Sequence, residues 1–431
     1  MRVVVAGTGV VGLWCARSLA ASGAEVTVIG PDATPAASTP ASAGWVVPML
    51  SAPLAGPGLV RHSAGQLLRG EAAFSFTGMS PGLARWLASL VRSGSEARHR
   101  AGLRATLDLA VTSQAAFHAL RTDGLDFELR HDGLVMVART GAGLREASAQ
   151  VDAAAAAGYP GKSERLDPDA LLELEPALAD GAAGGIYARD ELHVHPGQLN
   201  DALLDDVQAR GVRVLRRAVR AIVPATGGRW TVLTPDGPIM ADKVVVAAGY
   251  WSRDIIASLG VRLPLQSAAG LSITATGPEP PSLPLRLVEA HVAVTPFDGG
   301  VRLAGGFALG PPPGRVSPRQ LRRVVSAAAP YLRSWRPTRV SATHVGLRPA
   351  TPDSMPVVGE LPGHPGVFAA TGHGMLGLTL APGTAAEIEH QIASGAPTEI
   401  GAAFAVDRFR PGPAPHSPGR RPSARSARTG G

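Results

Sequence analysis

The architecture of this chain follows from residues 1–29, which read MRVVVAGTGVVGLWCARSLAASGAEVTVI. The run at 2–6 is apolar and rich in β-branched residues, which is typical of a strand buried on both faces of a parallel sheet. Glycines at positions 7, 9 and 12 follow at once, then an apolar helical pattern over 10–22 and a second strand pattern over 24–29. A strand, glycine turn, helix and strand in this order predict a dinucleotide-binding βαβ unit.

The three glycines are each expected to meet a separate steric demand. Gly7 makes the tight turn, Gly9 lets a pyrophosphate approach the backbone, and Gly12 lets the helix pack close to the strand. The first turn of the helix, at Val10 and Val11, offers free N–H groups and a partial positive charge to the phosphates.

The residue that should bind the adenosine ribose departs from this pattern. An acidic side chain is expected at the end of the second strand, but Gly30 stands there. We expect either Asp32 or backbone groups and water to take over this contact. Two other interpretations of the stretch are a ligand-free βαβ unit and a signal peptide cleaved near residue 22. Cleavage would remove the glycine motif and leave the second strand unpaired, so the signal peptide is rejected.

Composition narrows the class of protein. The 431 residues are 45% apolar, enough for two or three lobes with a large core. The formal charge is +7, but the segment 407–431 holds six arginines and one aspartate, so the rest carries only about +2. This distribution does not predict nucleic-acid binding. No apolar run approaches the roughly 18 residues of a membrane span, and the single cysteine, Cys15, fits a reducing cytoplasm.

Patterns further along the chain predict a second lobe. We expect a long apolar loop over 31–58 that folds over the cofactor, helices within 78–124, and a hairpin over 126–138 that turns at Asp132 and Gly133. Segments 263–276, 291–296 and 301–305 are expected to form a second, antiparallel sheet. His193 and His195 alternate in a strand fragment, but no third ligand is evident, so no metal site is expected. The segment after Asp407 is expected to be disordered.

A second candidate site lies in the last quarter of the chain. Arg348 is held between rigid residues in GLRPATPD, 346–353, and a fixed guanidinium suits a carboxylate that it binds with two hydrogen bonds. The glycine-rich turn TGHGMLG, 371–377, then opens a helix whose N-terminus could face the negative charge of a reduced flavin.

With these motifs in order, the chain resembles the FAD-dependent D-amino-acid oxidase superfamily, and most closely the bacterial D-amino-acid dehydrogenases of the small-subunit type. Glycine oxidase and sarcosine oxidase are more distant in this resemblance. The matching pieces are VVVAGTGVVG (3–12), SAGWVVPMLSAPLAGPG (42–58), VVVAAGYWS (244–252), GLRPATPDSMPVVG (346–359) and TGHGMLGLTLAPGTA (371–385).

The resemblance implies an α/β fold. A Rossmann-type, glutathione-reductase-like FAD-binding domain is expected over 1–80, 144–260 and 341–400. An inserted antiparallel α+β substrate domain is expected over 81–143 and 261–340. The segment 405–431 would remain a disordered basic tail.

The resemblance also implies the roles of individual residues. Arg348 would bind the substrate carboxylate, and His373 would either tune the flavin or brace its turn. The residues that would contact FAD are Gly7, Gly9, Val10, Val11, Gly12, Asp32, Ser42, Ala43, Gly44, Val219, Ala248, Gly249, Gly374, Met375 and Leu376.

Three positions depart from the family pattern. Ser42 replaces the usual asparagine before Ala-Gly. The sequence LQSAAG, 265–270, replaces a usual lysine-glycine pair in the first strand of the substrate domain, which bears on substrate identity. No cysteine lies near the C-terminal helix, so FAD is expected to bind non-covalently.

The activity implied is oxidation of an amino acid, a D-amino acid in the closest relatives. Hydride would pass from the substrate Cα to the flavin, and the imine product would hydrolyse to a 2-oxo acid and ammonia. The electron acceptor, whether quinone, another carrier or oxygen, stays open. Alternatives are oxidation of glycine or of a secondary amine of the sarcosine or D-proline type, a biosynthetic tailoring flavoenzyme, and an NAD-dependent dehydrogenase. The expected location is the cytoplasm, with peripheral contact to the membrane through the arginine-rich tail as a further option.

Overall fold

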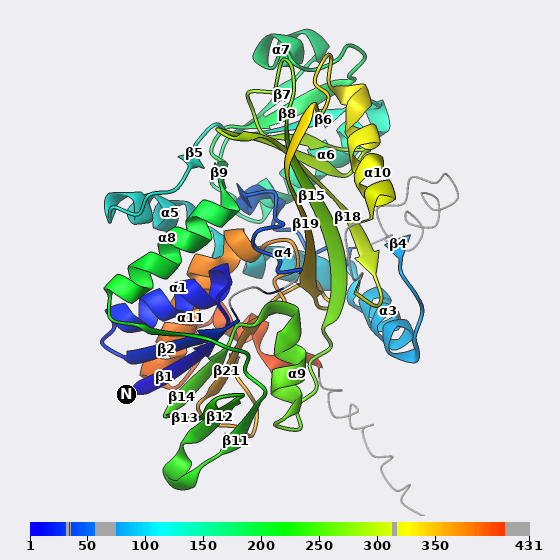
Figure 1. Cartoon of the computed structure of the whole chain (residues 1–431). Helices are drawn as coiled ribbons and strands as arrows, with labels where there is room; N and C mark the ends of the chain where they lie inside the picture. Colours follow the sequence, from blue (N-terminus) through cyan, green and yellow to red (C-terminus); the bar gives the residue numbers. More distant parts are fainter. Residues whose placement is uncertain (32–33, 35, 57–74, 313–316, 410–431) are drawn as a thin grey trace, which may run out of the picture.

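A computed structural model describes residues 1–31, 34, 36–56, 75–312 and 317–409. The N-terminal strand lies inside a six-stranded sheet of order β10-β2-β1-β14-β21-β20 (Figure 1). All neighbours run parallel except β20 and β21. The strands are β1 (Arg2–Ala6), β2 (Glu25–Gly30), β10 (Arg213–Arg216), β14 (Lys243–Val246), β20 (Val357–Glu360) and β21 (Val367–Thr371).

Alternation along β1 divides the core into two layers. Val3 and Val5 face the helices α1 (Val10–Ala21), α8 (Pro196–Ala209) and α11 (Gly377–Ser394). Val4 and Ala6 face the other side, which is covered by α9 (Ser252–Ala257) and by a small antiparallel sheet. That small sheet consists of β11 (Ala221–Pro224), β12 (Trp230–Thr234) and β13 (Gly237–Ala241). The expected buried parallel sheet, covered on both faces, is therefore confirmed.

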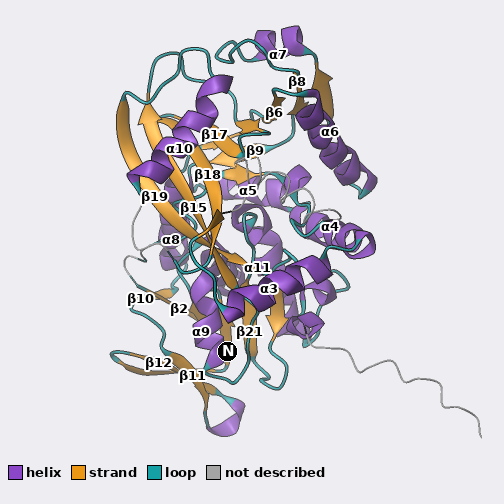
Figure 2. Cartoon of the chain, turned by 90° about the vertical axis from the view of Figure 1, so that its right-hand side faces the viewer, coloured by secondary structure: helices purple, strands orange, loops and turns teal. Residues whose placement is uncertain are grey.

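The second sheet has nine strands in the order β19-β15-β18-β17-β16-β6-β8-β7, with β4 pairing with β18. Helix α10 (Pro318–Ala328) packs on one face of it through Val324 and Ala328 (Figure 2). The strands are β4 (Ser75–Phe76), β6 (Leu134–Ala138), β7 (Ser163–Leu166), β8 (Gly184–Ala188), β15 (Gln266–Thr276), β16 (Leu285–Leu287), β17 (Val292–Phe297), β18 (Gly300–Leu309) and β19 (Arg339–Ala350).

The remaining helices form where their caps and patterns predict. Ser80, Ser95, Thr140 and Asp167 each accept a hydrogen bond from a backbone N–H in the first turn of the helix that follows. The helices are α3 (Pro81–Ser93), α4 (Glu96–Ala110), α5 (Ser113–Thr122), α6 (Gly141–Ala156) and α7 (Pro168–Leu174).

Two expectations about the chain path are wrong, the hairpin over 126–138 and the start of the tail at 405. β5 (Leu129–Arg130) pairs with β9 (Leu192–Val194), whereas β6 pairs with β8 and β16, so residues 126–138 form no hairpin. Gly133 turns the chain from one sheet into another. β7, β8 and β19 belong to the second sheet. Val406–Phe409 forms the 3-10 helix η6 with Val406 buried, so the expected tail does not begin at 405. Residues 410–431 lie outside the described residues.

Candidate active site

The turn after β1 is built for close approach of backbones. Gly7 has φ +141°, and a Cβ at this position would overlap the carbonyl of Ala247 at the end of β14. A Cβ at Gly12 would overlap the carbonyl of Gly7. Helix α1 therefore begins directly against the carboxyl ends of β1 and β14, as the motif predicts.

The first turn of α1 presents its backbone donors near a second loop. Gly9 is the N-cap residue of α1 and has an extended backbone. It makes no side-chain capping hydrogen bond. Thr39 Oγ1 lies 3.3 Å from the Val10 nitrogen and accepts its hydrogen bond. The amide of Val11 is likewise in the first turn, where N–H groups have no intrahelical acceptor. Thr39 therefore lies at the first turn of α1, where an anion would bind. The sequence did not indicate Thr39 as a residue near this turn.

The second glycine turn adjoins the arginine motif. Gly374 N donates to the carbonyl of Pro349 at 3.0 Å, and Ala350 bridges to His373. Gly372 has φ +81°, and a Cβ there would lie 2.8 Å from Thr351 Cγ2. The Met375 side chain in this turn is 59% exposed, which is unusual for a large apolar residue beside a core. Two motifs well separated in sequence therefore form one surface.

Two further predicted segments lie at the same edge. Thr371 Oγ1 donates to the carbonyl of Gly249, which follows Ala248 after β14. In the long loop, the Ala43 carbonyl accepts from Thr295 Oγ1 at 2.9 Å and the Gly44 carbonyl accepts from Val194 N at 2.8 Å.

The other cofactor candidates have different surroundings. Ser42 has a buried hydroxyl with no partner among the described residues. Leu376 N donates to the His373 carbonyl at 2.9 Å. Val219 lies between β10 and β11, packed against the core. Asp32 lies outside the described residues.

Arg348 lies across the second sheet. Its guanidinium passes over Gly270, where any Cβ would overlap it, and Nη1 donates to the Gly306 carbonyl at 2.7 Å. The guanidinium carbon is 5.8 Å from the centre of the Phe307 ring. Burial lowers the pKa of Arg348 to about 10. No carboxylate of a described residue pairs with it.

His373 is buried within the glycine turn. Its ring is 4% exposed, and Nε2 lies 2.9 Å from Thr384 Oγ1 on α11. Burial lowers its pKa to about 3, so the ring is neutral. The side chain therefore ties the glycine turn to α11.

Another arginine on the second sheet, Arg302, is buried and was not indicated by the sequence. Arg302 on β18 donates from Nε to Thr274 Oγ1, and from Nη1 to the carbonyls of Pro40 and Ser42. It is 3% exposed, and burial lowers its pKa to about 10. These contacts fix the loop before Ala43 onto the second sheet.

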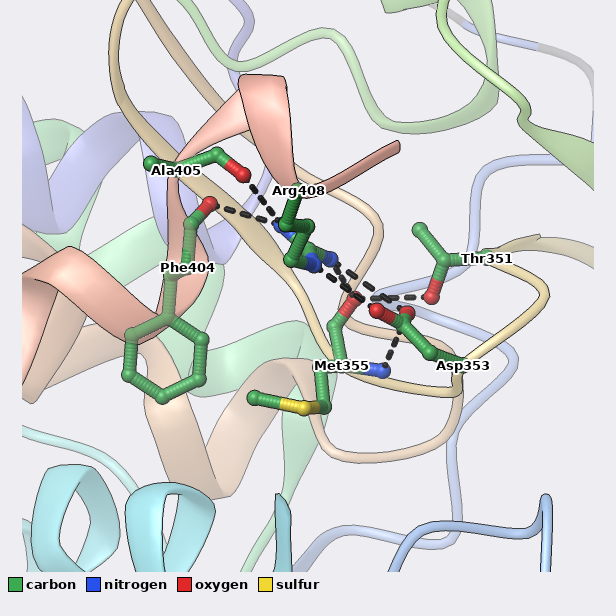
Figure 3. A network of polar contacts seen from close by, with 6 residues as sticks. All are labelled: Thr351, Asp353, Met355, Phe404, Ala405 and Arg408. Carbon is green, nitrogen blue, oxygen red and sulfur yellow. Dashed lines mark hydrogen bonds and ion pairs between the residues drawn. The ribbon is translucent and has the colours of Figure 1, made fainter. Parts of the chain in front are cut away.

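The turn that follows Arg348 is braced by the end of the described chain (Figure 3). Arg408 in η6 donates to both carboxylate oxygens of Asp353, and to the carbonyls of Met355, Phe404 and Ala405. The Met355 carbonyl also accepts from Thr351 Oγ1 at 2.7 Å. This network holds residues 351–355 in place beside the glycine turn.

The described part of the chain also bears on other classes of site. No helix there is long and apolar enough to cross a membrane. No group of three or more histidine, cysteine, aspartate or glutamate side chains is placed to hold a metal ion. His195 instead caps α8, since its Nδ1 accepts from Gln198 N at 3.2 Å.

Comparison with known proteins gives the family. The model of the DAO family, FAD dependent oxidoreductase, matches residues 2–391. A D-amino acid dehydrogenase of Rhizorhabdus wittichii is 31% identical over 95% of this chain and 100% of its own length. One of Cereibacter sphaeroides is 32% identical over 95% of each. The structure of glycine oxidase from Geobacillus kaustophilus superposes with a TM-score of 0.72 at 23% identity, covering 94% of this chain and 99% of that one. This chain belongs to the DAO family of FAD-dependent oxidoreductases.

Proposed function

We propose that this protein is a D-amino-acid dehydrogenase that uses non-covalent FAD to oxidise the carbon bearing the substrate amine. The observation that carries the proposal is Arg348, a cation that burial destabilises and that no carboxylate of the described residues neutralises. The carboxylate of an amino acid supplies the missing charge and accepts two hydrogen bonds from a guanidinium. The names of the relatives in Rhizorhabdus and Cereibacter support the same substrate class.

The residues present fit FAD. Gly7 and Gly12 permit backbone contacts that a Cβ would block, and the N–H groups of Val10 and Val11 in the first turn of α1 suit the pyrophosphate. The exposed Met375 and its neighbour Leu376 suit an aromatic ring system. Bound FAD supplies an acceptor for a hydride from the substrate. Cys15 is the only cysteine and is buried in α1, which supports non-covalent binding.

The domain arrangement is part of the proposal. We assign the six-stranded sheet and its covering layers to a glutathione-reductase-like FAD-binding domain. The nine-stranded sheet is assigned to an inserted substrate domain. The location of Arg348 on β19 of the second sheet, beside the glycine turn that follows β21 of the first, supports this division.

The contacts of Arg348 and of the residues around it support a role for each of them toward a substrate. Arg348 orients the carboxylate, and Gly270 leaves the space that its guanidinium occupies. Phe307 packs with Trp86 and Leu83 of α3 in an apolar cluster, which keeps water from the ion pair and suits an uncharged substrate side chain. His373 is turned to Thr384, so it braces the site rather than exchanging protons with substrate.

The electron acceptor and the location are further parts of the proposal, and each has a direct assay. An acceptor other than oxygen, such as a quinone, follows from the relatives' designation as dehydrogenases. Peripheral contact with an anionic membrane is supported by the exposed arginines of α10, Arg319, Arg322 and Arg323. Flotation with vesicles of anionic and of neutral lipid would test that contact.

The test of the activity is a screen for flavin bleaching without oxygen. The purified protein is mixed with D- and L-enantiomers of apolar, polar and charged amino acids, and with glycine, sarcosine and D-proline. We expect bleaching with apolar D-amino acids and none with their L-enantiomers. Bleaching by L-enantiomers alone, or only by secondary amines, would overturn the proposal. Repeating the assay in air, and with a quinone, identifies the acceptor.

A further inference from the structure

A small cavity lies beside the glycine turn, at the carboxyl ends of β2 and β10. Its volume is about 120 Å³, and Thr8, Gly30, Asn200 and Asp201 contribute to its lining. Gly30 pairs in register with Arg216, the last residue of β10. The carboxyl ends of parallel strands are where α/β sheets bind nucleotides. The cavity therefore lies where the adenosine half of a dinucleotide would be expected.

One wall of the cavity shows why no acid stands at position 30. A Cβ on Gly30 would lie 2.6 Å from Thr8 Oγ1 and 2.7 Å from Thr8 Cγ2. Both distances are too short for unstrained contact, so a side chain at position 30 and the observed position of Thr8 exclude each other. The missing acid is thus a property of the packing at this turn, and its hydrogen-bonding role must fall to other groups.

Asn200 and Asp201 of α8 also line this cavity. Asn200 lies on α8, and its Oδ1 is buried without a hydrogen-bond partner among the described residues. An unpaired buried amide oxygen costs free energy, and such atoms in native proteins are usually satisfied by water or a ligand. Asp201 follows directly and adds a carboxylate to the same cavity.

We propose that Asn200 and Asp201 hold the ribose hydroxyls of FAD, in place of the acid that the family fold expects at position 30. Ribose 2′- and 3′-hydroxyls are donors, and an amide oxygen and a carboxylate are both acceptors. The contact is thereby moved from the end of β2 to helix α8, which packs against α1 over the same sheet.

The experiment measures the dissociation constant of FAD from the full-length protein. FAD is removed by dialysis, and the apoprotein is titrated with FAD while flavin fluorescence is followed. Asn200→Ala and Asp201→Ala should each weaken binding by about three- to tenfold, the range for one lost hydrogen bond. Asp205→Ala removes a carboxylate in the same way one turn further along α8 and should have no effect. Asn200→Asp keeps an acceptor oxygen and should bind more tightly than Asn200→Ala.

A second measurement separates ribose contact from general damage. ADP and 2′- or 3′-deoxy-ADP compete with FAD for the apoprotein. In the wild type, one deoxy compound should bind about three- to tenfold more weakly than ADP, and Asn200→Ala should abolish that difference. If the variants bind FAD as the wild type does, or if they still discriminate against the deoxy compounds, the proposal is wrong. Neither readout depends on the substrate, so the result is independent of the proposed amino-acid oxidation.

Discussion

The guanidinium of Arg348 on β19 lies directly over Gly270, a diagonal neighbour on the paired strand β15. Residue 348 is in register with Ala268, so the side chain runs two residues along β15 before Nη1 reaches the Gly306 carbonyl. A Cβ at position 270 would overlap the guanidinium carbon and both terminal nitrogens. The sequence LQSAAG at 265–270, a departure from the family pattern, thus ends in the residue that admits the arginine.

Gly270→Ala should therefore impair the site without removing FAD. The methyl group forces the guanidinium out of its position, and a misplacement of about 1 Å in a positioning group can cost on the order of 10²-fold in rate. We expect kcat/KM for the best substrate to fall by roughly that factor while the flavin spectrum is retained. Steady-state kinetics with the substrate identified by the bleaching screen provides the measurement.

The control for this variant is Gly299→Ala. Residue 299 lies just before β18 in the same lobe, and a Cβ there meets nothing within 4 Å. This substitution should leave kcat/KM unchanged. Normal turnover by the Gly270→Ala variant would show that the observed position of Arg348 is not the productive one.

Removal of the guanidinium itself should have a larger effect. Arg348→Ala leaves the substrate carboxylate without its partner, and loss of one member of a buried charge pair costs about 2–5 kcal/mol. We expect that loss in kcat/KM, with FAD still bound. Arg348→Lys keeps the charge but not the paired donors, so it should recover only part of the activity.

Comparing substrates makes this prediction specific. The amine analogue that lacks the carboxylate should be handled equally by the wild type and by Arg348→Ala, because neither makes the ion pair with it. If Arg348→Ala oxidised amino acids at the wild-type rate, another residue would have to be the anchor. Arg302 would be the first alternative, since it is a buried cation on the second sheet.

The sequence predicted what depends on local pattern. The βαβ unit at 1–29 could be predicted because the strand period, the glycine spacing and the helix period all agree within one short segment. The pairing of strands from distant segments could not be predicted in this way. β19 was missed as a strand because Gly346 and Pro349 interrupt its pattern, and those residues are acceptable where the loop before Ala43 and the glycine turn approach it.

The failures at 126–138 and at the chain end share one cause. β5 and β6 look like a hairpin because they are adjacent, but each finds its partner elsewhere, in β9 and β8. Residues 406–409 have the composition of a tail, yet Arg408 has a distant partner in Asp353. Likewise, nothing in the sequence relates Gly30 to Thr8, since that relationship is steric. Contacts with distant residues decide the strand pairing, the structure of residues 406–409 and the packing at Gly30. Such contacts cannot be predicted from local composition.

Acid should destabilise the protein through His373. Burial lowers its pKa from 6.5 to about 3, so between these values the unfolded chain binds the proton and the folded chain does not. The contribution to stability is complete above pH 6.5 and is lost as the pH falls toward 3. His373→Gln removes this linkage, so its unfolding free energy should depend less on pH than that of the wild type. Urea denaturation at several pH values between 8 and 4 measures the difference.

The same variant tests whether His373 acts as a brace. His118→Gln, at an exposed position on α5, is the control and should keep the wild-type pH dependence of unfolding. If His373 only ties the turn to Thr384, the pH profile of kcat should have the same shape in His373→Gln and the wild type. A lost limb in that profile would instead give the imidazole a part in proton transfer.

Arg408 should stabilise the fold although it lies next to the expected tail. Its guanidinium holds the Asp353 carboxylate from two nitrogens and satisfies three backbone carbonyls, and both ion-pair side chains are less than one-fifth exposed. Arg408→Ala leaves these acceptors unpaired, and the unfolding free energy should fall by about 2–3 kcal/mol. Arg408→Lys cannot make the paired contact and should lose a large share of the same unfolding free energy.

The control is Arg333→Ala. Its ion pair with Asp180 is more than half exposed, so the unfolding free energy should change by less than about 1 kcal/mol. Because Asp353 and Met355 follow Arg348 in one turn, the Arg408→Ala variant should also raise KM at temperatures where it remains folded. Equal stability of the Arg408 and Arg333 variants would show that the network in Figure 3 is incidental to the fold.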